Sequence, residues 1–178
     1  SSPVETAIYG VASRFLVVGQ LTNSAIGLAA QPQVASLNAA EQHDAVKGVY
    51  RTTTTWIILV NGPLYLILAI FSPLLLRLFN PEYSSAWPIT VVLCAAAYIG
   101  NGSGMVDVML SMTGRTRWTL ANSLGALALQ VGLDIVLIPS AGAMGAAIGW
   151  AVSIIAINAM SVAQLAWSDG IHPFGAET

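Results

Sequence analysis

Three ionisable residues lie inside otherwise apolar stretches of the chain: Arg14, Asp107 and Asp134. An ionisable side chain at membrane depth is costly and usually faces a bundle interior or another charge. If these stretches cross a membrane, Arg14 and Asp134 fall at similar depths, so an ion pair between them is a hypothesis. Two alternatives compete with it, since Asp134 can reach the membrane interface and Arg14 can extend outward along its long stem. Asp107 is equally compatible with an interfacial position.

Residue types that carry enzymatic or metal chemistry are sparse. His43 and His172 are isolated, and Cys94 is the only cysteine, so no cluster has the spacing of metal ligands. Ser103, in the run 101–104, lacks the G-x-S-x-G spacing of a serine nucleophile and has no histidine in a helix to act as its base. No phosphate-binding glycine loop and no basic run for nucleic acid is present. The sequence therefore predicts no enzyme, cofactor or nucleic-acid partner.

Polar side chains instead recur at helical spacing within the apolar stretches. Steps of three, four or seven residues put them on one face of a helix, and three such striped helices favour a shared water-filled cavity. The alternative is helix packing, because small residues and amides also join membrane helices. Gly100-x-x-x-Gly104 and Gly145-x-x-x-Gly149 fit that second role. The candidate cavity-lining residues are Arg14, Gln20, Ser24, Asn122, Gln130 and Asp134.

The elements that carry these stripes must lie in a membrane. Charged residues make up 8% of the 178 residues and hydrophobic residues 56%, whereas about 25% of an ordinary soluble domain is charged. Residues 52–76, 83–106 and 135–168 carry no charge at all. Each stretch exceeds the roughly 20 apolar residues that a crossing helix needs. The fold class is therefore an all-α membrane protein with about five transmembrane helices.

Proline and glycine set the expected helix limits. A polar link is expected at 31–52, a kink at Pro63, and a tight turn at 139–142. Together the helices form one transmembrane domain, residues 1–167, followed by a tail, 168–178. The expected helices span about residues 3–30, 53–76, 86–110, 118–138 and 143–167.

Basic residues indicate the orientation. Lys47, Arg51, Arg115 and Arg117 fall in the links after the first and third helices, and the opposite side has Arg77. The positive-inside rule places the side richer in lysine and arginine in the cytoplasm. We therefore expect a multi-pass protein of the cytoplasmic membrane, with its first link and its C-terminus cytoplasmic.

Several short motifs occur in an order typical of one transporter family. Residues 9–14 read Tyr-Gly-Val-Ala-Ser-Arg, and residues 78–83 read Leu-Phe-Asn-Pro-Glu-Tyr. Gly114-Arg115 and then Pro139-x-x-Gly142-x-x-Gly145-Ala146-Ala147 follow. Over roughly residues 5–165 the chain resembles the polysaccharide (oligosaccharide) flippases of the multidrug/oligosaccharidyl-lipid/polysaccharide exporter superfamily. It departs from them at Ala7 and Asn80, where the family often has glycine.

The resemblance implies a protein of two six-helix lobes, of which this chain matches helices eight to twelve, most of the C-terminal lobe. The N-terminal lobe is then missing, and the absence of an initial methionine fits a fragment. The implied function is movement of a lipid-linked oligosaccharide, a polyprenyl-pyrophosphate sugar, across the membrane for polysaccharide biosynthesis. Alternating access would come from rocking of the lobes, the polyprenyl tail would stay in the bilayer, and Arg14 is a candidate partner for the pyrophosphate.

Two other readings remain open. One is an exporter of drugs or organic cations in the same superfamily, which would favour acidic and aromatic cavity residues over arginine. The other is a non-transport multi-pass membrane protein, such as a scaffold subunit or an enzyme with catalytic residues elsewhere.

Overall fold

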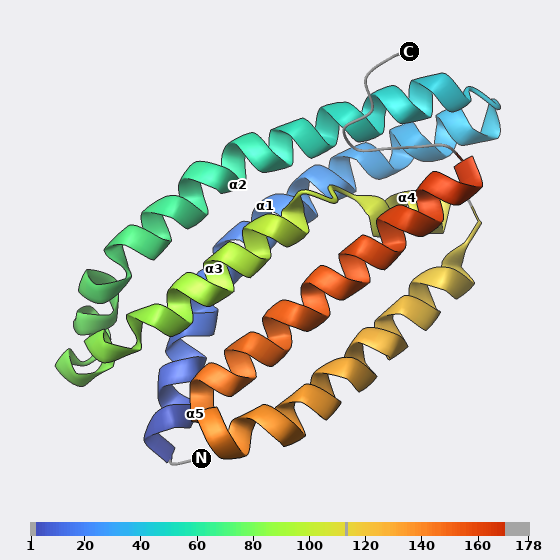
Figure 1. The fold of residues 1–178 in the computed structure, drawn as a ribbon. Coiled ribbons are helices and arrows are strands. Elements are labelled where there is room, and N and C mark those ends of the chain that lie inside the picture. The colour runs from blue at the N-terminus through green and yellow to red at the C-terminus, as the bar shows by residue number, and fades with distance from the viewer. Residues whose placement is uncertain (1–2, 113, 170–178) are drawn as a thin grey trace.

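The computed structural model describes residues 3–112 and 114–169, and this part of the chain is helical throughout, without strands. Long helices lie side by side in one bundle (Figure 1). The predicted all-α class is confirmed. The elements are α1 (Pro3–Ala39), α2 (His43–Phe79), the 3₁₀ helix η1 (Pro81–Ala86), α3 (Trp87–Asn101), α4 (Val106–Met112) and α5 (Thr116–Asp169).

Three helical stretches are long and apolar enough to cross a membrane: His43–Phe79, Trp87–Met112 and Thr116–Trp167. The third contains two antiparallel arms that meet at Gly142, where the backbone leaves helical geometry with φ 55° and ψ −133°. Each arm exceeds the roughly 20 residues of one crossing, so by length alone these stretches suffice for four crossings. α1 is 37 residues long but is not among the three. A fifth crossing by α1 stays a prediction.

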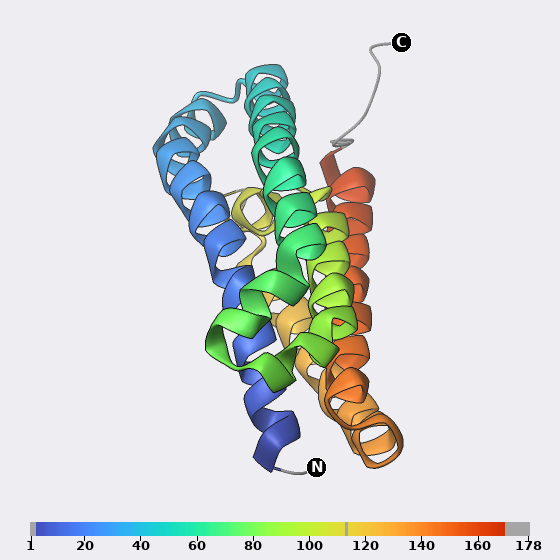
Figure 2. The same ribbon diagram turned by 90° about the vertical axis from the view of Figure 1, so that its left-hand side faces the viewer.

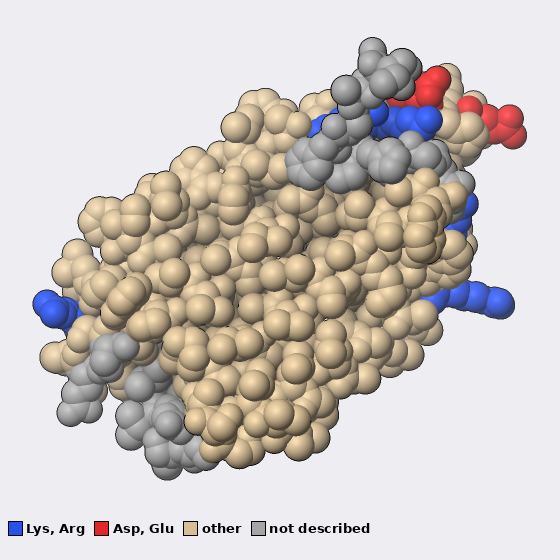
Figure 3. Space-filling model, viewed as in Figure 1, with Lys and Arg blue, Asp and Glu red and all other residues tan. Residues whose placement is uncertain are grey.

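On one face of the bundle the sides are apolar and the visible charges lie at the ends. On the face in Figure 3, blue and red side chains gather at the two ends, and the long body between them shows none. Leu21, Leu66 and Ile135 are 65%, 61% and 69% exposed on these sides. Such a surface would be unfavourable in water and suits a hydrocarbon environment.

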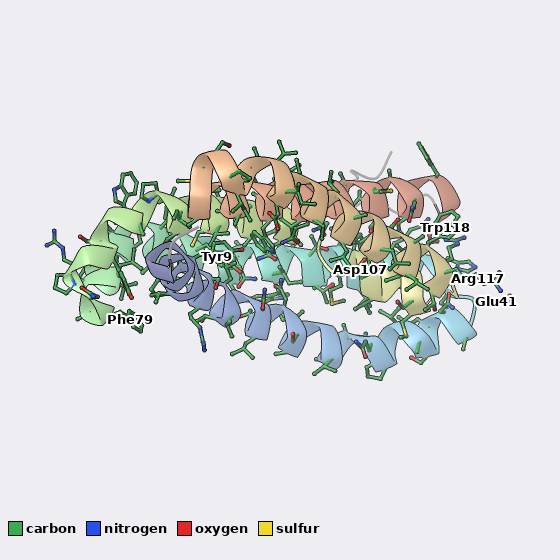
Figure 4. The ribbon with its side chains drawn as sticks, turned by 90° about the horizontal axis from the view of Figure 1, so that it is seen from below. Tyr9, Glu41, Phe79, Asp107, Arg117 and Trp118 are labelled. Carbon is green, nitrogen blue, oxygen red and sulfur yellow. The ribbon has the colours of Figure 1, made fainter. Side chains whose placement is uncertain are left out.

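Segments far apart in the sequence share one end of the bundle. Glu41 and Arg117 lie together at one end, and Phe79 lies at the other (Figure 4). The turn after α1 and the start of α5 therefore share one end of the bundle, as the charge pattern predicts. Which of the two ends faces the cytoplasm stays a prediction.

The predicted polar link at 31–52 is wrong, because α1 continues to Ala39 and α2 begins at His43. Both extensions are held by packing, since Val34, Val46 and Tyr50 are buried in one apolar cluster. Figure 2 shows α1 and α2 running up to the short turn that joins them.

That turn is a Schellman motif. The N–H of Gln42 donates to the carbonyl of Leu37 at 3.0 Å, and the N–H of Glu41 donates to that of Asn38 at 3.1 Å. Glu41 takes the left-handed conformation, φ 56°, that glycine usually supplies at this position. Because this position holds glutamate and not glycine, it lacks the usual local signal for a helix end.

The single helix predicted at 86–110 is also wrong, because residues 102–105 separate α3 from α4. Gly104 has φ 63°, and a Cβ there would lie 2.0 Å from Thr54 Oγ1, so this position requires glycine. The opened backbone is supported from α2, where the Tyr50 hydroxyl donates to the Ser103 carbonyl at 2.5 Å. Buried backbone groups at a break must find such partners.

The predicted tight turn at 139–142 is confirmed. α5 continues through Pro139 and reverses at Gly142. The returning arm passes so close that a Cβ on Gly145 would lie 2.4 Å from the Leu137 carbonyl oxygen. α2 continues through Pro63 and Pro73 as one helix, and the predicted tail lies outside the described residues from position 170.

Candidate functional site

A polar cavity of about 560 Å³ lies between two apolar clusters of the bundle core. The cluster nearer the Glu41 end contains Val34 and Tyr50, and the other contains Leu16 and Leu93. A volume of this size falls in the range of ligand pockets, roughly 300–1,000 Å³. The polar and aromatic lining consists of Gln20, Asn23, Ser24, Gln31, Tyr65, Asn101, Asp107, Trp150 and Asn158.

Two helical faces form opposite walls of this cavity. On α1, Gln20, Ser24 and Gln31 are separated by four and seven residues, which puts them on one side of the helix. On the second arm of α5, Trp150 and Asn158 are separated by two turns and face the same space. The predicted polar stripe of α1 therefore lines the cavity, and α5 contributes the aromatic ring of Trp150 to it.

The break between α3 and α4 forms a third wall. Gly100, Asn101, Gly104 and Met105 all contact the cavity. Non-helical backbone at membrane depth is tolerated where it is buried in protein or lines a cavity. In transporters, interrupted helices of this kind mark the binding region.

A chain of asparagine amides connects α2, α1 and α3 beside the cavity. Asn61 Nδ2 donates to Asn23 Oδ1 at 2.7 Å, and Asn23 Nδ2 donates to Asn101 Oδ1 at 2.6 Å. Asn61 is fully buried and Asn101 is 8% exposed. The chain is open at both ends, because Asn61 Oδ1 and Asn101 Nδ2 have no hydrogen-bond partner.

A second polar group holds the break against α5. Ser103 Oγ is hydrogen-bonded to Asn158 Oδ1 and also donates to the Gly100 carbonyl at 2.7 Å. Asn158 Nδ2 donates to the Ile154 carbonyl at 2.7 Å. The broken segment is thus tied to α5 by Ser103 and to α2 by Tyr50.

Among the described residues that line the cavity, Asp107 is the charged one. Figure 4 shows it within the bundle, away from the end marked by Glu41 and Arg117. Its side chain is exposed, and Ser161 Oγ lies 3.5 Å from its Oδ1. The sequence left open whether Asp107 faces the bundle interior or the membrane interface. In the structure it lines the cavity inside the bundle.

The predicted cavity residues divide into two groups. Gln20 and Ser24 line the cavity. Arg14 is exposed, Gln130 is partly buried, and neither is among the lining residues. Any role of these residues in binding stays a prediction.

Asn122 is used for helix packing. Its side chain is 2% exposed, and its Nδ2 donates to Gln164 Oε1 at 2.7 Å and to Ser161 Oγ at 3.0 Å. Gln164 Nε2 donates back to Asn122 Oδ1 at 2.8 Å. These bonds join the two arms of α5, and Asn122 is not among the described residues that line the cavity, so its role in binding stays a prediction.

The Arg14–Asp134 pair is not formed. Among the described residues the ion pair present is Lys47–Asp44, at 3.5 Å. Asp134 Oδ1 is buried without a hydrogen-bond partner and packs against Gly149, where a Cβ would lie 2.5 Å from it. Arg14 is exposed, which agrees with the alternative that its stem extends outward.

Sequence reasoning missed the amide chain and Trp150 as parts of the cavity. Asn23, Asn61 and Asn101 do not form a stripe on any one helix, since each comes from a different helix. The available signal was the glycine-rich run 101–104 inside an apolar segment, which predicts an interrupted helix.

The chemistry of the cavity is hydrogen bonding and aromatic contact. Within residues 3–112 and 114–169 no three histidine, cysteine or acidic side chains gather as metal ligands do. The five amides of the lining, Gln20, Asn23, Gln31, Asn101 and Asn158, can donate and accept hydrogen bonds.

An apolar helical bundle with a polar cavity beside a broken helix has the architecture of a membrane transporter domain. The MatE family model matches residues 2–136, more than half of the 178 residues. The chain therefore belongs to the MatE family, whose members are membrane transporters of the multidrug/oligosaccharidyl-lipid/polysaccharide exporter superfamily. Comparison with curated proteins and with solved structures finds no significant match.

Proposed function

We propose that this chain is part of a transporter that moves lipid-linked oligosaccharide across the cytoplasmic membrane, with the sugar headgroup passing through the polar cavity. The observation that carries the proposal is the lining: five amide side chains and Ser24 beside the ring of Trp150. Amides match the alternating donors and acceptors of sugar hydroxyls. An aromatic ring offers a flat surface for the apolar face of a sugar.

The pyrophosphate of such a substrate would bind outside this cavity. No lysine or arginine is among the described lining residues, and Arg14 is exposed away from them. Asp107 would repel a pyrophosphate at short range. We therefore assign the neutral sugar to the cavity and expect cationic residues of an N-terminal lobe, or of the membrane interface, to meet the pyrophosphate.

Export of organic cations is the second candidate, and a specific observation favours it. The one charged residue in the lining is acidic, and Tyr65 and Trp150 lie in the same cavity. Aromatic faces and a carboxylate attract a ligand cation. The two candidates differ in what Asp107 does, since a cation requires its charge and a sugar requires only an acceptor.

Asp107→Asn in the full-length protein, reconstituted in liposomes, separates the candidates. The substrates are undecaprenyl-diphosphate-linked N-acetylglucosamine and tetraphenylphosphonium. For a sugar transporter we expect the variant to keep translocation of the sugar lipid within about fivefold, because asparagine still forms hydrogen bonds. The control is Arg117→Gln, at the charged end of the bundle.

Translocation of tetraphenylphosphonium by the wild type, with loss in Asp107→Asn and no movement of the sugar lipid, would favour the cation exporter instead. Orientation has its own test, since a cytoplasmic C-terminus predicts that a C-terminal green fluorescent protein fusion fluoresces and an alkaline phosphatase fusion stays inactive.

A further inference from the structure

The open end of the amide chain lies at the cavity. Resting on the proposed function, we infer that Asn101 is a specificity-determining residue whose Nδ2 donates a hydrogen bond to an oxygen of the sugar headgroup. The oxygen can belong to a hydroxyl group, the ring or an acetamido carbonyl. The cavity would thereby select neutral headgroups that present an acceptor at this position.

The location of Asn101 supports this role. It is the last residue of α3, directly before the break, and it lines the cavity although its side chain is only 8% exposed. Its Oδ1 is occupied by Asn23 Nδ2 at 2.6 Å. Its Nδ2 is itself buried and makes no hydrogen bond of good geometry, although the Tyr65 hydroxyl lies close to Asn101.

The direction of the chain determines which group is presented. Asn61 Nδ2 donates to Asn23, and Asn23 Nδ2 donates to Asn101. Because Asn23 uses both its oxygen and its nitrogen, turning its amide would break both bonds. The oxygens of Asn23 and Asn101 are therefore used as acceptors, the Asn61 oxygen is left unpaired at the α2 end, and the group left at the Asn101 end is a donor.

A buried donor without a hydrogen-bond partner discriminates strongly between ligands. A ligand oxygen satisfies the N–H group, whereas an ammonium or phosphonium group brings no acceptor and leaves it unpaired. Sites that hydrogen-bond a substrate reject analogues lacking the matching group. One such bond corresponds to roughly a tenfold to hundredfold difference in affinity.

Asn101→Asp tests the inference with little change in size. The substitution removes the Nδ2 donor and keeps an oxygen for Asn23. The matched control is Asn38→Asp, since Asn38 Nδ2 donates to the Met112 carbonyl at 3.2 Å, outside the cavity. Asn101→Ser, which keeps a donor, should fall between Asn101→Asp and the wild type.

The measurement is the affinity of the full-length protein in nanodiscs for undecaprenyl-diphosphate-linked N-acetylglucosamine, with undecaprenyl phosphate as the sugar-free probe. We expect Asn101→Asp to weaken binding of the sugar lipid at least about tenfold and to leave undecaprenyl phosphate unchanged. Asn38→Asp should leave both affinities unchanged. Thermal unfolding confirms that each variant is folded before its affinity is compared.

Two outcomes would overturn the inference, and they can be told apart. If the wild type binds the sugar lipid and Asn101→Asp binds it equally well, the role of Asn101 is wrong while the proposed function stands. If the wild type does not distinguish the sugar lipid from undecaprenyl phosphate, the proposed function fails and the role of Asn101 fails with it.

Discussion

Two groups of amide side chains in this bundle have the same chemistry and opposite arrangements. In α5, Asn122 and Gln164 bond each other twice, and Ser161 adds a third bond. Beside the cavity, Asn23 and Asn101 belong to a chain that ends in unpaired groups. We call the first group closed, because its amides bond each other, and the second group open, because its chain ends in groups without a partner.

The difference shows how a membrane helix uses a polar side chain. Closed bonds satisfy both partners inside the bundle, so they join helices and need nothing from outside. An open chain leaves buried polar groups unpaired, a cost that water or a ligand can relieve. We therefore assign the α5 group to stability and the cavity group to binding.

Gly145→Ala should separate the arms that the closed group joins. Its Cβ would lie 2.4 Å from a backbone oxygen of Leu137, and a backbone atom at a turn cannot move away cheaply. We expect the free energy of unfolding to fall by about 3 kcal/mol, measured by thermal unfolding in detergent. Gly132→Ala is the control, because nothing lies within 4 Å of its Cβ. Equal stability of the two variants would contradict the close packing of the hairpin.

Asn122→Leu should cost less, about 1–2 kcal/mol, because Gln164 loses both its bonds with Asn122 while the backbone stays in place. Adding Gln164→Leu should recover part of this loss, since both partners of the bonds lost in Asn122→Leu are then apolar. Transport by the folded fraction should stay within twofold of the wild type. A specific loss of transport at full stability would instead place Asn122 in the substrate path.

Ser24→Trp should fill the cavity with little effect on the fold. Ser24 lines the cavity and is exposed, so stability should change by about 0.5 kcal/mol or less. Translocation of the sugar lipid should fall at least tenfold. The control is Ala25→Trp, one residue further on α1, which lines a separate apolar groove. If both variants transport equally, the cavity is not the path of the headgroup.

Arg14→Gln should have the smallest effect. Arg14 is exposed and makes no ion pair with Asp134, so unfolding and transport should both match the wild type within error. The double charge exchange Arg14→Asp with Asp134→Arg should not restore function better than either single change. Recovery in the double variant would show that the pair forms in another state of the transporter.

The sequence predicted the helical membrane class, the reversal at 139–142 and the Gln20–Ser24 face of the cavity. These follow from local signals: uncharged stretches, a proline–glycine turn and helical spacing. It could not separate Asn122 from Asn101, because both are amides in apolar helices. What distinguishes them is the partner supplied by another helix: Gln164 from the second arm of α5, and Asn23 from α1.

The predicted helix limits were wrong for a related reason. The extension of α1 to Ala39 depends on the burial of Val34 against α2, and the break after Asn101 depends on Tyr50 and Thr54 of the same helix. Both are tertiary contacts that local preference does not encode. The turn between α1 and α2 likewise has no glycine to mark it, because Glu41 takes the left-handed conformation there.

Water access separates the open group from the closed group most directly. In a Cys94→Ala background, Ser24→Cys and Ser161→Cys are each a change of one atom, the first in the cavity lining and the second fully buried beside Asn122. The full-length protein in membranes is treated with a charged, membrane-impermeant thiosulfonate on either side. We predict rapid labelling of Ser24→Cys, with protection by sugar lipid, and no labelling of Ser161→Cys. Labelling of Ser161→Cys with Ser24→Cys unreactive would contradict the account.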